Sequence, residues 1–125
     1  MIELVYKDLS YKIIGILYDV HNKIGGGHKE IYYHHAVKMA LDQNNLGYKE
    51  ELFLPLIYNK KKIGKYFIDF LIENKIVLEL KRGDYFNKQD INQVYGYLQS
   101  NKLTLGILAN FTKHKVRIKR IVNLK

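Results

Sequence analysis

The segment 66–81 constrains the fold more than any other part of the chain, because it consists of two apolar runs separated by a polar turn. Such a pattern is typical of a β-hairpin. If residues 73–75 form a three-residue loop, Asp69 lies directly opposite Glu79. One face of the hairpin is then entirely apolar and carries Ile68, Phe70, Ile72, Ile76, Leu78 and Leu80. The other face carries Phe67, Asp69, Leu71, Val77, Glu79 and Lys81. Because a shift of one residue would mix the two sets, we expect two carboxylates about 5 Å apart, with Lys81 further along the same face.

Two carboxylates directly opposite each other destabilise a sheet unless something offsets their repulsion. A divalent cation is the simplest candidate, because Mg²⁺ and similar hard ions take carboxylate oxygens together with water and substrate phosphate. A lysine beside such an ion can orient a water, lower the pKa of that water, or stabilise a phosphate in a transition state. In the alternative interpretation, Lys81 only neutralises Asp69 and Glu79 on a solvated face.

Further motifs lie on both sides of this hairpin. Residues 27–33 fit Gly-x-x-Glu-x-x-Tyr, and they are followed by Asp69 and by Glu-Leu-Lys at 79–81. The run Gln-Val-Tyr-Gly-Tyr-Leu comes next at 93–98, and Lys-Arg-Ile-Val-Asn lies at 119–123. In this order and spacing the chain resembles the GxxExxY family, which belongs to the PD-(D/E)xK nuclease superfamily. The resemblance covers nearly the whole chain.

This resemblance implies a fold and a set of residue roles. The fold would be a restriction-endonuclease-like core of the α/β (α+β) class. The implied catalytic residues are Glu30, Asp69, Glu79, Lys81 and Gln93. Of these, Asp69, Glu79 and Glu30 would bind Mg²⁺ or Mn²⁺, and Lys81 would be the catalytic lysine. Tyr33 matches the family tyrosine. Ile68 stands where the superfamily name has proline, a departure that is common across the superfamily.

The remaining pattern predicts a central mixed sheet flanked by helices, in the order ααβββαββ. The predicted helices span residues 10–24, 28–44 and a third segment that starts at Asp84 or Asn87 and ends near 100. The predicted strands span residues 51–58, 62–72, 75–81, 103–109 and 115–122. Ser10 is expected to cap the first helix, and the glycines at 25–27 to end it. The residues expected to face inward on the first two helices include Ile13, Leu17, Tyr18, His21, Ile31, Val37 and Leu41.

Length and composition limit the kinds of protein that this chain can be. A chain of 125 residues is expected to form one domain, spanning 1–125, with a real core. The absence of cysteine excludes a disulfide framework and thiolate zinc sites. The histidines at 21, 28, 34, 35 and 114 do not form a convincing zinc pattern. No secretory leader or membrane span is recognised, so we expect an intracellular, cytoplasmic protein without a membrane partner.

The formal net charge of +9 favours a polyanionic partner such as nucleic acid. Lysine-rich solubility is the alternative explanation. Four cations recur at every second position and would form a basic stripe along a strand: Lys113, Lys115, Arg117 and Lys119. This stripe would bind phosphates, or else protect an edge strand against aggregation.

The function that these observations favour is metal-dependent hydrolysis of phosphodiester bonds in nucleic acid, most readily DNA. The alternatives are a non-catalytic nucleic-acid-binding module that keeps the nuclease fold, and an interaction domain with structural carboxylates. The acid pair favours the enzyme, because two carboxylates without a metal would repel phosphate. A chain of this size has no room for a separate specificity domain, so a homodimer or a partner protein would supply specificity.

Overall fold

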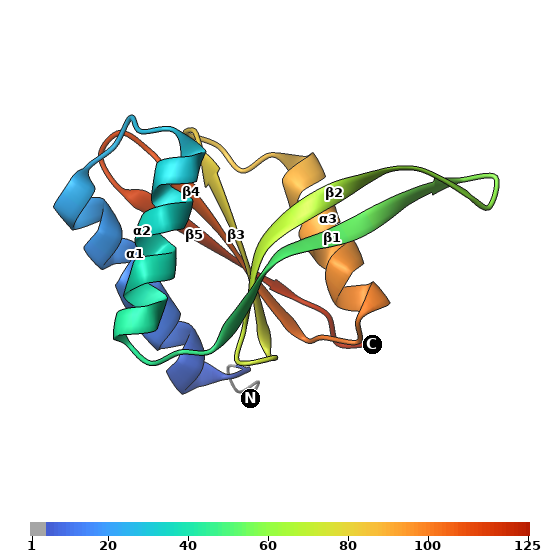
Figure 1. The fold of residues 1–125 in the computed structure, drawn as a ribbon, viewed down its shortest axis with the longest axis horizontal. Coiled ribbons are helices and arrows are strands. Elements are labelled where there is room, and N and C mark those ends of the chain that lie inside the picture. Colours follow the sequence, from blue (N-terminus) through green and yellow to red (C-terminus); the bar gives the residue numbers. More distant parts are fainter. Residues whose placement is uncertain (1–4) are drawn as a thin grey trace.

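The computed structural model describes residues 5–125, which form helices on both faces of one five-stranded sheet (Figure 1). The elements in chain order are α1 (Lys7–Ile24), α2 (Glu30–Gln43), β1 (Tyr48–Tyr58), β2 (Lys61–Ile72), β3 (Ile76–Arg82), α3 (Lys88–Ser100), β4 (Leu105–Phe111) and β5 (Val116–Val122). This order is the predicted ααβββαββ, and the predicted mixed sheet flanked by helices is confirmed. Within the described residues, no helix is long and apolar enough to cross a membrane.

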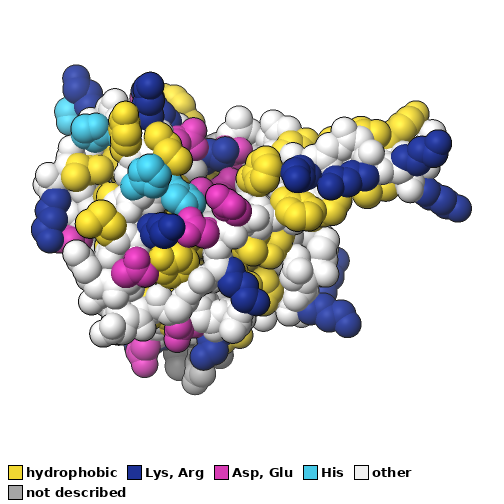
Figure 2. Space-filling view, viewed as in Figure 1, with side chains coloured by type: hydrophobic (Ala, Val, Ile, Leu, Met, Phe, Trp, Pro, Cys, Tyr) yellow, Lys and Arg dark blue, Asp and Glu magenta, His cyan; other side chains and the backbone are white. Residues whose placement is uncertain are grey.

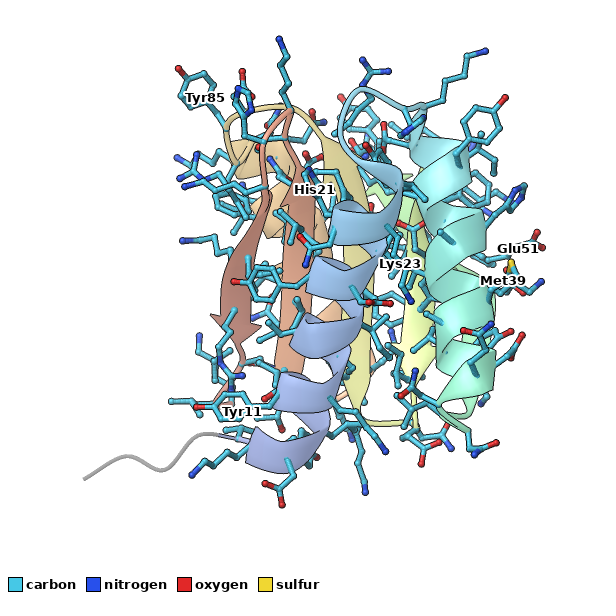
Figure 3. All side chains as sticks on the ribbon, turned by 90° about the vertical axis from the view of Figure 1, so that its left-hand side faces the viewer. Tyr11, His21, Lys23, Met39, Glu51 and Tyr85 are labelled. Carbon is cyan, nitrogen blue, oxygen red and sulfur yellow. The ribbon has the colours of Figure 1, made fainter. Side chains whose placement is uncertain are left out.

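The strands lie in the order β1-β2-β3-β4-β5, and only the pair β3–β4 is parallel. A parallel pair needs a crossover connection, and α3 provides it. Helices α1 and α2 lie side by side on one face of the sheet (Figure 3). Their buried side chains form one core with Phe70, Leu78 and Ile107. Helix α3 covers the other face and forms a second core with Val77 and Leu108. The central strands are therefore buried on both sides.

Of the three helix ends for which the sequence predicted a terminal residue, two are as predicted. Gly25 adopts a left-handed φ of 76° and its N–H donates to the carbonyl of His21, so the predicted glycine C-cap is confirmed. The Asn87 side chain accepts from the N–H of Gln89, which makes Asn87 the start of α3. The prediction that Ser10 caps α1 is wrong, because α1 begins at Lys7 and the buried Ser10 hydroxyl donates to the Lys7 carbonyl.

Two residues expected to face inward are instead exposed. Tyr18 on α1 and Ile31 on α2 are both about half exposed. On α1 the buried stripe passes through Ile13, Leu17 and Val20, which turns Tyr18 outward. Ile31 lies in the first turn of α2, beyond the edge of the helical core, where it borders an open hollow.

The register predicted for the β2–β3 hairpin is confirmed, but the pairing is short. Ile72 pairs with Ile76, and Phe70 pairs with Leu78. Beyond Phe70 the two strands diverge, and β2 continues with β1 alone as a two-stranded ribbon that leaves the body of the molecule (Figure 1). We call this divergence the fork, and the outer hairpin, residues 52–68, the ribbon. The fork also corrects one expected face, because Ile68 packs with α3 whereas Phe70 packs with α1 and α2.

The predicted basic stripe is not a single strand face. Lys113 and Lys115 lie in the turn before β5, and only Arg117 and Lys119 lie on the strand, which is an edge of the sheet. The Arg117 guanidinium lies 5.2 Å from the centre of the Phe86 ring. The strand starts later than predicted because Thr112 closes the turn, its hydroxyl donating to the Lys115 carbonyl at 2.7 Å.

Candidate active site

Asp69 and Glu79 meet at the fork, where main-chain pairing between β2 and β3 stops. Each carboxylate accepts a hydrogen bond from the opposite strand. The Asp69 N–H donates to Glu79 Oε1 at 3.0 Å, and the Leu80 N–H donates to Asp69 Oδ2 at 2.8 Å. Two amides that would otherwise lack strand partners are satisfied in this way. The two carboxylates therefore lie opposite each other, as the sequence register predicted, at a point where the strands separate, which the sequence did not predict.

The environment of this pair shifts the pKa values of the two acids in opposite directions. Burial and the neighbouring Asp69 carboxylate raise the pKa of Glu79 to about 10. Burial also opposes ionisation of Asp69, but hydrogen bonds from His34, Glu79 and the Leu80 amide outweigh it and lower the pKa of Asp69. Two like charges this close cannot both ionise freely. At neutral pH the pair therefore holds one proton, on Glu79, and one negative charge, on Asp69.

Lys81 lies among three carboxyl groups. Its Nζ is 3.9 Å from Glu79 Oε2, 4.0 Å from Glu30 Oε1 and 3.8 Å from Asp90 Oδ1. Burial alone would lower the pKa of Lys81, but these acids outweigh burial and raise it. Lys81 is therefore an ammonium ion at neutral pH. Helix α2 supplies Glu30 and helix α3 supplies Asp90, so the lysine joins both helical layers to the fork.

Asp90 was not identified from the sequence. It lies in the first turn of α3, where a carboxylate is already explained by the helix dipole. Three residues further, on the same face of the helix, lies the predicted site residue Gln93, which is half-buried. Tyr97, one helical turn after Gln93, is buried in the core.

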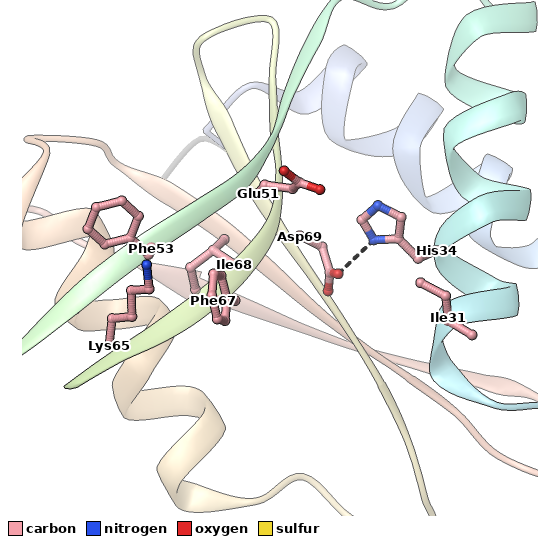
Figure 4. A pocket seen from close by; sticks show the side chains of 8 residues that line it. All are labelled: Ile31, His34, Glu51, Phe53, Lys65, Phe67, Ile68 and Asp69. Carbon is pink, nitrogen blue, oxygen red and sulfur yellow. Dashed lines mark hydrogen bonds and ion pairs between the residues drawn. The ribbon is translucent and has the colours of Figure 1, made fainter.

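His34 is a second residue that sequence reasoning missed. Its Nδ1 donates to Asp69 Oδ1 at 2.7 Å (Figure 4). Its Nε2 donates to Glu50 Oε1 at 3.1 Å. The hydrogen bond to Asp69 is the main cause that raises the pKa of His34, and Glu50 acts in the same direction. The imidazole also stacks on Phe70, with 4.4 Å between the ring centres. The available signal was its spacing, since His34 follows Glu30 by one helical turn and shares its face.

Tyr33, the predicted motif tyrosine, does not reach the carboxylates. It is buried, stacks on Phe111 with 4.1 Å between ring centres, and donates its hydroxyl proton to the Gly25 carbonyl at 2.8 Å. It therefore joins the glycine turn to α2 and fixes where that helix begins. Because Glu30 is the first residue of α2, Tyr33 helps to position Glu30 without contacting the carboxylates itself.

The donor set at the fork fits a hard divalent cation in part. Asp69 and Glu79 offer carboxylate oxygens, and an ion of the Mg²⁺ type commonly takes one or two carboxylates and completes its shell with water and phosphate. Burial and the neighbouring Asp69 carboxylate raise the pKa of Glu79, so a cation at this pair would favour ionisation of both acids. Among residues 5–125, no group of three or more His, Cys, Asp or Glu side chains is arranged as a metal site. Glu30 contacts Lys81, with 4.0 Å between Oε1 and Nζ. Its role as a third metal ligand beside Asp69 and Glu79 therefore stays a prediction.

Known proteins share this fold. The chain matches the family model described as the PD-(D/E)XK nuclease superfamily over residues 7–121. It is similar to a solved structure titled "Crystal structure of SSO0001", with 20% sequence identity and a TM-score of 0.56. That match covers 94% of this chain and 58% of the other, so this chain spans a little over half its length. At this identity the likeness shows the fold alone. Among curated proteins, no match was found.

Proposed function

The chain belongs to the PD-(D/E)XK nuclease superfamily, and we propose that it is a nuclease that hydrolyses phosphodiester bonds in DNA with Mg²⁺ or Mn²⁺. The observation that carries this proposal is the placement of Asp69 and Glu79 at the fork with Lys81 3.9 Å from Glu79. These residue types at this spacing match the superfamily motif, and the order of motifs supports membership of its GxxExxY group.

In this proposal Asp69 and Glu79 would hold the metal ion, and Glu30, whose Oε1 lies 4.0 Å from Lys81 Nζ, is the predicted third carboxylate. The ion, when bound, would supply Lewis acidity toward the scissile phosphate. The protein's own part begins with His34, which fixes the plane of the Asp69 carboxylate through its Nδ1. Glu50 accepts from the other ring nitrogen and keeps the imidazole in place. The chain thus orients its first carboxylate before any substrate arrives.

Lys81 acts as a positive charge in this proposal and not as a base, because its raised pKa keeps it protonated. An ammonium group held near a phosphate stabilises the additional negative charge of the transition state. Asp90 and Glu30 hold the ammonium group between the two helices. Gln93, on the same face of α3 as Asp90, would orient a water or the substrate.

The test is a cleavage assay on labelled single-stranded, duplex and branched DNA, with the matching RNA strands, in Mg²⁺ or Mn²⁺. The wild type should cleave at least one DNA substrate, and Asp69→Asn and Glu79→Gln should not. Asp19→Asn, which changes an exposed carboxylate on α1, is the matched control and should cleave like the wild type. Binding without cleavage by the wild type would favour the non-catalytic module. Cleavage that survives Asp69→Asn would contradict the proposed site.

A further inference from the structure

The ribbon is the most exposed apolar segment of the described chain, and the site at the fork does not account for it. Beyond the fork, β1 and β2 pair only with each other, out to the pair Tyr58–Lys61. The large hydrophobic side chains exposed on it are Phe53, Leu56, Ile57, Tyr58, Ile63 and Phe67. Figure 2 shows hydrophobic and lysine side chains together along this arm. Exposed apolar surface of this extent indicates a binding surface.

The two faces of the ribbon differ at its base. Leu52 and Leu54 pack against α3, where Gly96 allows the close approach, because a Cβ there would lie 3.0 Å from Leu54 Cδ2. On the opposite face Phe53 and Phe67 form a direct cross-strand pair. They remain 44% and 61% exposed. One face therefore holds the ribbon to the body, and the other presents two phenyl rings to solvent.

Lysines lie directly over these rings. Lys65 Nζ is 4.9 Å from the centre of the Phe53 ring and 5.3 Å from that of Phe67, and Lys62 Nζ is 5.0 Å from Phe53. Residues 52–68 contain lysines at 60, 61, 62 and 65 and no acidic residue. The ribbon thus combines flat aromatic surfaces with uncompensated positive charge, which is the combination that binds unpaired nucleic acid.

An open hollow connects this surface to the proposed active site. Its volume is about 590 Å³, and it lies between α2 and the ribbon (Figure 4). Ile31 and His34 line it from α2, and the strands contribute Glu51, Phe53, Lys65, Phe67, Ile68 and Asp69. Hollows of a few hundred Å³ or more accommodate small organic ligands. The phenyl pair and the first metal-binding carboxylate therefore open onto the same space.

We propose that the hollow and the Phe53–Phe67 pair receive unpaired nucleotides next to the scissile phosphate, so that the substrate is single-stranded DNA or DNA with an unpaired stretch. This inference rests on the proposed nuclease function. Unpaired bases have free faces that stack on phenyl rings, and Lys62 and Lys65 contact the backbone phosphates. A duplex keeps its bases stacked inside and offers the ribbon only phosphate. The chemistry at the fork would then act on a strand that the ribbon holds.

The test measures binding alone, with a chelator present to remove divalent cations, so it does not depend on cleavage. The probes are a fluorescent oligodeoxythymidine of ~12 nucleotides, within the range of strand lengths that such surfaces hold, and a duplex of equal length. Phe67→Leu and Phe53→Leu keep an apolar side chain and remove the aromatic face. Each should weaken single-strand binding by about 5- to 150-fold, the effect of losing one stacked base, and leave duplex binding nearly unchanged.

Tyr11→Ala is the matched control, because Tyr11 is an aromatic residue with 53% exposure on α1, and it should bind like the wild type. Unchanged single-strand binding in both leucine variants would overturn the proposal, as would equal losses on strand and duplex.

The ribbon could instead bind a second copy of the chain, and sedimentation velocity tests this alternative. A wild-type dimer that the leucine variants convert to monomer, with strand binding retained, would make the ribbon an assembly surface and also overturn the proposal. A chain that binds strands as expected but cleaves none would contradict the nuclease function alone.

Discussion

The two halves of β2 have similar hydrophobic character and opposite surroundings. Phe70 and Ile72 are fully buried, because β1 and β3 flank them and the core of α1 and α2 covers them. Phe67, on the far side of the fork, pairs only with β1 and is mostly exposed. Beyond the fork, therefore, only the side chains that face α3, such as Ile68, are buried, and the opposite face of the ribbon contributes little to folding. The difference shows that one strand is part of the core on one side of Asp69 and presents an exposed aromatic face on the other, where we propose that it contacts a ligand.

The sharpest test of this comparison is a pair of matched substitutions in the same strand. Phe70→Ala should lower the free energy of unfolding by about 3–5 kcal/mol, because it leaves a cavity in a packed core. Phe67→Ala should change it by no more than about 0.5 kcal/mol, as for other exposed positions. Urea denaturation followed by circular dichroism measures both. Similar losses in the two variants would show that the ribbon is part of the folding core.

The fork itself should contribute to chemistry and little to substrate binding. Lys81→Ala should lower the single-turnover cleavage rate by ~10²-fold or more, the scale of one preorganised electrostatic group. Its Mn²⁺ affinity should stay near that of the wild type. Lys75→Ala removes an exposed lysine from the β2–β3 turn and serves as the matched control. An unchanged cleavage rate in Lys81→Ala would remove Lys81 from the mechanism.

Metal binding at the fork should release a proton, because a cation can bind both carboxylates only after Glu79 ionises. With the pKa of Glu79 at about 10, Mn²⁺ affinity should rise roughly tenfold per pH unit from pH 6 to 8. Calorimetry in buffers of different ionisation enthalpy measures the proton count. The expected count is about one in the wild type and about zero in Glu79→Gln. A wild-type count near zero would mean that Glu79 is already ionised.

The same ionisation predicts how the metal-free protein responds to pH. Glu79 has a folded pKa of about 10 and an ordinary value of 4.5, so between these values the folded state binds more protons than the unfolded state. The stability that this proton contributes is complete below pH 4.5, declines as the pH rises, and is lost above about pH 10. Glu79→Gln should flatten that decline. Urea midpoints measured across this range in the presence of a chelator would reveal it.

The smallest expected effect is a change in the salt dependence of DNA binding, which would distinguish the ribbon from the predicted basic stripe. If Lys119 contacts phosphate, Lys119→Ala should reduce the slope of log affinity against log salt by ~1 on duplex DNA. Lys65→Ala should do the same on single strands, where each phosphate counts for ~0.7. A change confined to Lys65→Ala would assign the nucleic-acid footprint to the ribbon. The stripe would then be an edge guard, and its removal should raise light scattering.

The sequence predicted the hairpin well because alternation of apolar and acidic residues allows only one register. It also predicted Asp69, Glu79 and Lys81 as neighbours, since one strand pair contains all three. Asp90 and His34 were missed for a physical reason. Each comes from a different helix. Spacing within a helix shows which residues share a face, but how that face is placed against a sheet depends on packing between distant segments. The fork was missed for the same reason, because the strand pattern continues through it unchanged.

The fork also contains its own reporters. The amides of Asp69 and Leu80 donate to the two carboxylates, whereas the neighbouring pair Phe70–Leu78 belongs to the regular ladder. An amide exchanges its hydrogen with solvent only when its hydrogen bond opens. When a carboxylate loses its proton or turns toward a cation, the amide bound to it should exchange at a different rate, while those of Phe70 and Leu78 keep theirs. Hydrogen–deuterium exchange at these two positions would therefore follow the state of the site in the unmodified chain, with internal standards one and two residues away.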